Sequence, residues 1–114
     1  MIITTGNDVS GSAISGYLGV VRGIVVRSPS IGQGFVGGLK SLVGGNNETF
    51  AEVCDAAREE AFQRMLRHAA QIGADAVIGM RYDATEFAPG VTEVLAYGTA
   101  VKCAGGLTRQ ASYE

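Results

Sequence analysis

Residues 48–72, ETFAEVCDAAREEAFQRMLRHAAQI, decide the fold, because the helical period is clearest in this stretch. Apolar side chains recur at every third or fourth position, which predicts one long amphipathic helix. The predicted core stripe consists of Phe50, Val53, Cys54, Ala57, Ala61, Met65 and Ile72. A second, narrower apolar stripe lies about 100° around the helix and consists of Phe62, Leu66 and Ala69. Gly73 then suits the left-handed position that ends a helix.

The helix is followed by a predicted β-hairpin. Residues 75–87 alternate apolar and polar side chains, which is typical of a strand with one buried face. Pro89 and Gly90 suit the two central positions of a type II turn. Residues 92–103 form the second long strand, so the C-terminal part of the domain is an antiparallel pair.

The clearest strand before the helix is residues 17–27, which is rich in β-branched side chains. Both of its faces are apolar, which in so small a protein suggests that a neighbouring subunit covers one of them. Residues 2–5 could add a short edge strand, residues 6–16 a loop, and residues 31–45 a short helix weakened by glycine.

This order of elements predicts a two-layer α+β fold, with helices on one face of a three-stranded antiparallel sheet. At 114 residues the chain fits one domain, which we place at residues 1–103, followed by a flexible tail at 104–114. Hydrophobic content is 46% and charged content only 18%, below the usual value of about 25%. Such a chain must expose apolar surface or bury it against a partner, most commonly copies of itself.

The composition also disfavours several partners. A formal charge of −2 with scattered Lys and Arg argues against nucleic acid. No apolar run approaches the roughly 20 residues of a membrane span, and the first residues lack the pattern of a signal peptide. Two cysteines without such a signal suggest reduced thiols in the cytoplasm.

One glycine pattern resembles a nucleotide site. Residues 32–37 spell G-x-G-x-x-G after a strand, where glycines let backbone N–H groups approach a pyrophosphate. The context is wrong, because the next elements are a helix and a hairpin and not a parallel βαβ unit. Lys40-Ser41 imitates the end of a P-loop, but Leu39 replaces its required glycine. We therefore expect no nucleotide cofactor.

The candidate metal ligands are Cys54, Cys103 and His68, without a CxxC pair or a second histidine. Cys54 lies within the core stripe, where a thiol behaves as a small hydrophobic group. His68 is roughly 21 Å further along the helix, so these two side chains cannot share an ion. Cys103 could approach Cys54 only if the last strand crosses beneath the helix. We expect no metal site within one chain, while a site between subunits stays open.

No catalytic constellation is evident, since the chain has one histidine and no nucleophile elbow. Arg58 and Glu59 lie on the outer surface of the helix, beside Phe62. We favour an ion pair at a subunit contact for them over a catalytic role. An enzyme whose site lies between subunits stays open as an alternative.

Three segments together resemble a known family: Ala57-Arg58-Glu59-x-Ala61-Phe62, Gly73-Ala74-Asp75-Ala76-Val77-Ile78-Gly79 and Gly98-Thr99-Ala100-Val101-Lys102. The chain is similar to the bacterial YbjQ-like family, UPF0145, often labelled "putative heavy-metal-binding", over residues 1–102. The resemblance implies a dodecin-like β-α-β-β subunit in a pentameric ring, and no established activity. The chain departs from the pattern at residues 31–38, where glycines replace bulkier or charged side chains.

The second stripe of the helix, Phe62, Leu66 and Ala69, has no predicted partner within the chain, so we expect it to contact another subunit together with Arg58 and Glu59. The sequence thus predicts a cyclic homo-oligomer, with five subunits implied by the resemblance alone. The leading interpretation is a non-enzymatic scaffold or small-ligand-binding protein. The alternatives are a heavy-metal-binding protein and an enzyme with an inter-subunit site.

Overall fold

A computed structural model describes residues 1–27 and 47–105 of the chain. The predicted short helix at 31–45, the glycine pattern at 32–37 and nearly all of the predicted tail lie outside the described residues. The described elements are β1 (Ile2–Ile3), β2 (Ile14–Arg27), α2 (Asn47–Gln71), β3 (Ala76–Ala88) and β4 (Val91–Cys103). The long helix and the hairpin thus agree with the sequence prediction to within one residue at each end. Gly90 in the hairpin turn has φ = 73°, as its place in a type II turn requires.

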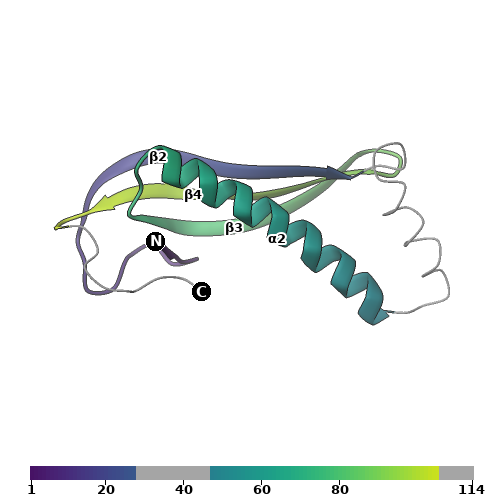
Figure 1. Cartoon of the computed structure of the whole chain (residues 1–114), viewed down its shortest axis with the longest axis horizontal. Coiled ribbons are helices and arrows are strands. Elements are labelled where there is room, and N and C mark those ends of the chain that lie inside the picture. Colours follow the sequence, from purple (N-terminus) through teal and green to yellow (C-terminus); the bar gives the residue numbers. More distant parts are fainter. Residues whose placement is uncertain (28–46, 106–114) are drawn as a thin grey trace.

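The predicted α+β fold with two layers is confirmed, because α2 packs on one face of a single sheet (Figure 1). The prediction of a three-stranded antiparallel sheet is wrong in number and type. The sheet has four strands in the order β1-β3-β4-β2, and it is mixed, because β1 pairs with β3 in parallel. The pairing extends past the two residues of β1, since Thr4 N–H donates to the carbonyl oxygen of Val77 at 3.0 Å.

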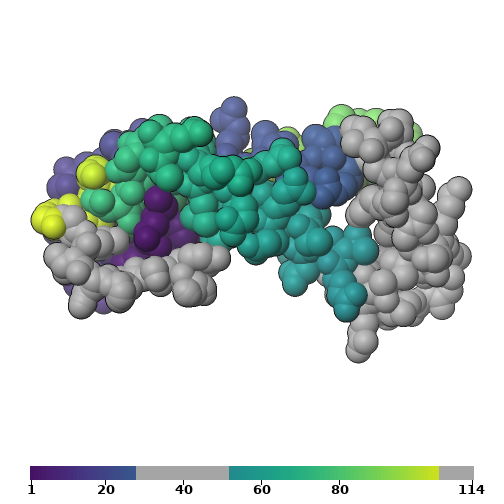
Figure 2. Space-filling view, in the orientation of Figure 1, coloured from purple at the N-terminus to yellow at the C-terminus, as the bar shows by residue number. Residues whose placement is uncertain are grey.

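Two hydrophobic clusters lie on opposite faces of the sheet, because neighbouring residues of a strand such as Ala100 and Val101 belong to different clusters. The cluster beneath α2 contains Met65, Val21, Val25 and Val77, all essentially inaccessible to solvent. The side chains of Met1 and Ile3 pack against it, and Figure 2 shows the first residues beside the C-terminal half of α2. The smaller cluster consists of Val9, Ala76, Ile78, Val101 and Cys103. The segment 6–13 therefore covers one end of the face that α2 leaves open.

The division of α2 into two apolar stripes is wrong. Phe62 is 7% exposed and Ala69 is fully buried, both in the chain's own core, and Leu66 packs against that core. Cys54 and Ile72, which were assigned to the core stripe, are exposed instead. Cys54 is exposed because α2 follows an oblique path, with its C-terminal half over the strands and its N-terminal half diverging from them (Figure 1). Ile72 lies beyond the last residue of α2. A long helix on a twisted sheet therefore does not bury the same angular face along its whole length.

The exit from α2 explains why the segment Gly73-Ala74-Asp75 is needed. Gly73 adopts φ = 81°, which ends the helix. Asp75 accepts a hydrogen bond of 2.8 Å from the backbone N–H of Cys103, and Lys102 lies 3.5 Å from the same carboxylate. The N–H of Cys103 first, with Lys102 in addition, lowers the pKa of Asp75 below its ordinary value. The carboxylate thus holds the end of β4 beside the start of β3.

Candidate functional site

The sheet has two long outer edges. β2 is the outer strand on one side, and β3 takes that place on the other side beyond Met80. Backbone contacts to β3 from the N-terminal segment end there, with Met80 N–H donating to Thr4 O at 3.0 Å. Beyond that point, β3 is paired with β4 alone among the described strands. Both edges are therefore open to contact with another molecule.

Exposed apolar side chains concentrate on these two outer strands. Among the described residues, six large hydrophobic side chains are classed as exposed, and five of them belong to β2 or β3. Those five are Tyr17 (71%), Leu18 (39%) and Val20 (65%) on β2, and Tyr82 (40%) and Phe87 (61%) on β3. The sixth is Ile72, which follows α2. An isolated chain therefore leaves these five apolar side chains in contact with water.

Side chains of α2 cover the backbone of the β2 edge at its centre. Arg64 donates from Nη1 to the carbonyl oxygen of Ile24 at 2.8 Å. The backbone N–H of Arg22 donates to Nδ1 of His68 at 3.3 Å, which requires an Nδ1 without a proton. Arg64 and His68 are four residues apart and so stand on the same side of the helix. They occupy backbone groups that an added strand would otherwise use.

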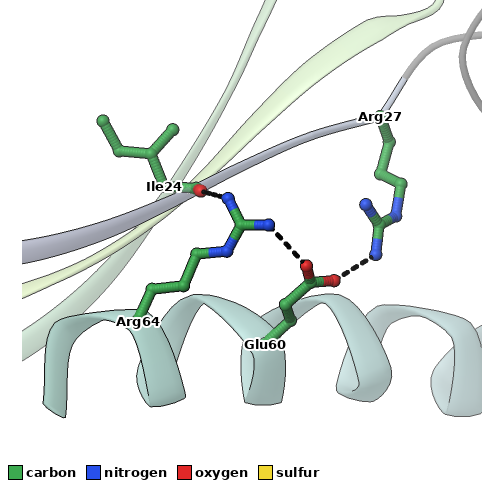
Figure 3. A network of polar contacts seen from close by, with 4 residues as sticks. All are labelled: Ile24, Arg27, Glu60 and Arg64. Carbon is green, nitrogen blue, oxygen red and sulfur yellow. Dashed lines mark hydrogen bonds and ion pairs between the residues drawn. The ribbon is translucent and has the colours of Figure 1, made fainter. Parts of the chain in front are cut away.

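Glu60 links β2 to α2 at the same edge (Figure 3). Its carboxylate accepts from Arg27 at 2.7 Å and from Arg64 at 2.8 Å, so one acidic group joins β2 to α2. The hydrogen bond from Arg27 is the main cause of a lowered pKa for Glu60, with Arg64 contributing. The charged residues of this side are Arg22, Arg27, Glu60 and Arg64. We call this side the basic flank, since three arginines outnumber one carboxylate.

The opposite side of the molecule, along β3, is acidic. Its carboxylates are Glu52, Asp55 and Glu59 on α2 and Asp83 and Glu86 on β3. The three helix carboxylates line an open groove of about 500 Å³ against Tyr82, with the guanidinium of Arg58 5.6 Å above the Tyr82 ring. Asp83 accepts a hydrogen bond of 2.9 Å from the backbone N–H of Ala84. A charged side chain therefore occupies a backbone group on this strand as well. We call this side the acidic flank.

The residues predicted for a subunit interface are found in two different places. Phe62, Leu66 and Ala69 belong to the core of the chain, so the argument that they lack a partner within it does not hold. Arg58 and Glu59 both line the acidic groove. Their side chains have different partners there: the guanidinium of Arg58 lies over the Tyr82 ring, and Glu59 accepts a hydrogen bond of 2.8 Å from Gln63 Nε2. Sequence reasoning missed the flanks, because they depend on the order of strands in the sheet.

The predicted metal ligands lie far apart. Cys54 is exposed on the N-terminal half of α2, whereas Cys103 is buried at the end of β4, at the opposite end of the molecule (Figure 1). The ring of His68 is bound to the backbone of Arg22. Within residues 1–27 and 47–105, no three His, Cys, Asp or Glu side chains are placed to hold one ion.

No helix in the same residues is both long and apolar enough to cross a membrane.

The fold and its two outer edges define a small α+β protein, with one helix on a four-stranded mixed sheet in the described residues. The family model described as "Putative heavy-metal-binding", YbjQ, matches residues 1–104, and the chain belongs to this family, UPF0145. A UPF0145 protein of Legionella pneumophila is 58% identical over 101 residues, covering 89% of this chain and 96% of its own. One from Chromobacterium violaceum is 55% identical, covering 89% and 86%.

A crystal structure of a DUF74 family protein from Pediococcus pentosaceus has the same fold. Its TM-score is 0.56 at 21% identity, and the match covers 91% of this chain and 98% of that one. That protein is described as one of unknown function. This likeness supports the fold.

Proposed function

We propose that this protein is a cyclic homo-oligomer that serves as a non-enzymatic scaffold or binds a small ligand, and that its copies meet through the outer strands. The observation that supports this proposal is the concentration of exposed apolar side chains on β2 and β3. Full burial of one such side chain contributes about 1.5–3 kcal/mol. Tyr17, Val20 and Phe87, each more than 60% exposed, would recover much of that at every contact. The number of five subunits is proposed from the family resemblance.

Sedimentation velocity tests this proposal. Wild-type protein should sediment as an oligomer, and Val20→Asp should shift the distribution to monomers, because the charge would enter a desolvated contact. Ile72→Asp is the matched control, since Ile72 is exposed and apolar but lies outside the outer strands; its assembly should equal that of the wild type. A monomeric wild type, or a Val20→Asp protein that assembles normally, would refute the proposal.

Heavy-metal binding is the second candidate. The description of the family favours it, and Cys54 offers an exposed free thiol on α2. Such a site would draw ligands from several copies, since a single thiol does not hold a soft metal ion firmly. Protein dialysed after loading with zinc should then retain the metal, and Cys54→Ser should lose it. Equal retention in Cys54→Ser would count against this candidate.

The free thiols also support the proposed location in the reducing cytoplasm.

A further inference from the structure

We propose that His68 is an acid-sensitive latch, which binds the centre of β2 to α2 while its ring is neutral and releases β2 when the ring is protonated. The backbone N–H of Arg22 donates to Nδ1 of His68 at 3.3 Å, across 46 positions of sequence. The latch lies within one chain, so it does not depend on the proposed self-association.

The chemistry of the imidazole ring makes this contact conditional. Because Nδ1 accepts a hydrogen bond, the proton of the neutral ring must lie on Nε2. A protonated ring carries a proton on both nitrogens and cannot accept from a backbone N–H. The contact between Arg22 and His68 is therefore open to the neutral ring alone.

Positive groups surround His68 on both elements that form the contact. On α2, Arg64 lies one turn before His68, and Arg67 directly precedes it. On β2, Arg22 itself carries a guanidinium, and the β4 residue opposite it is Tyr97, which brings no carboxylate. Protonation of His68 would thus place a further cation among cations, which favours movement of the ring away from the strand.

Carboxylates that could stabilise a protonated ring are placed elsewhere. Glu60, the last carboxylate of α2, lies two turns before His68 and is held by Arg27 and Arg64. Glu93 on β4 pairs with Val26, four residues along β2 from Arg22. The carboxylates of β3 lie beyond β4, at the other edge of the sheet. Both the lost acceptor and the neighbouring charges therefore act in the same direction.

The latch responds in a pH range of its own. His68 is the one histidine of the chain, and histidine is the side chain that ordinarily changes charge between about pH 5 and 8. The contribution of Asp75 is lost only in stronger acid, because folding lowers its pKa below the ordinary 3.8. Mild acid thus acts on the β2 edge before it acts on the junction of β3 and β4.

Opening of the latch is a local change. With the ring protonated, the N–H of Arg22 loses its acceptor and becomes open to water. Arg64 still donates to the carbonyl oxygen of Ile24, and Gly23 between them still packs against α2. One of the two helix side chains that bind the β2 backbone is thus released while the core stays closed.

Amide exchange in ¹⁵N-labelled wild-type protein tests the latch. The exchange rate of Arg22 N–H, corrected for its intrinsic dependence on pH, should be about fivefold higher near pH 5.5 than near pH 7.5. The N–H of Gly79, which donates to the carbonyl oxygen of Gly6 at 2.8 Å, is the internal control and should not change. The ring nitrogen shifts should show the proton on Nε2 at the higher pH.

Two variants separate the ring from its surroundings. His68→Leu removes the acceptor at every pH, so Arg22 N–H should exchange fast at both pH values and lose the pH response. Arg67→Gln changes a charge beside His68 but keeps the acceptor, so the response should remain. The latch is overturned if the wild type shows no response, if the response persists in His68→Leu, or if the neutral ring carries its proton on Nδ1. An equal rise at Gly79 would show general loosening and would overturn it as well.

Discussion

The backbone of Gly23 on β2 lies against the backbone of Ala61 on α2, so closely that a methyl group on Gly23 would overlap the carbonyl oxygen of Ala61. The same methyl group would stand 2.5 Å from the backbone nitrogen of Met65. Backbone atoms of a helix cannot move away by a side-chain rotation, whereas the end of a flexible side chain can. Gly23 therefore sets the distance between the helix and the sheet, and with it the packing of the whole core.

Gly23→Ala should lower the free energy of unfolding by about 1–3 kcal/mol or more, because α2 must move away from β2. Urea denaturation followed by circular dichroism measures this loss. Gly16→Ala is the control on the same strand, since an added methyl group there meets nothing within 4 Å; we expect its effect to be small. Equal losses for both variants would contradict the proposed close approach.

Stability should fall in acid partly through Asp75. Because folding lowers the pKa of Asp75, its contribution is present above the ordinary value of 3.8 and is lost as the pH falls through the folded pKa. Asp75→Asn should lower the free energy of unfolding by about 1 kcal/mol at pH 7. It should also flatten the decline of stability below pH 4. Some decline should remain, because Glu60 also has a lowered pKa. An unchanged acid profile in Asp75→Asn would contradict the assignment.

The two thiols should differ in reactivity towards an alkylating reagent. In Cys103→Ser protein, the remaining Cys54 thiol is exposed on α2 and should react about as fast as the same thiol in the unfolded chain. In Cys54→Ser protein, the remaining Cys103 thiol is 4% exposed and should react only as fast as the domain opens. Urea should speed the second reaction far more than the first. The reverse order of rates would be incompatible with the packing of β4.

Local patterns were enough to predict α2 and the hairpin of β3 and β4. The helix follows from apolar spacing and from Gly73, and the turn from Pro89 and Gly90, all of which act over a few residues. Chain order also indicated the α+β class. The burial of Phe62 and the exposure of Cys54 were not predictable in this way. Both depend on how α2 crosses the sheet, which is fixed by contacts between distant segments such as the close approach of Gly23 to Ala61.

The sequence by itself determined the family, the long helix, the strands around it and the excess of apolar over charged residues, since these are properties of composition and of neighbours along the chain. Only the tertiary structure decided which strands are outermost. The parallel pairing of β1 with β3 and the insertion of β4 between β3 and β2 leave β2 and the far part of β3 at the edges. Strand order arises from contacts between residues far apart in sequence. For that reason the two oppositely charged flanks have no signature in any single stretch of the chain.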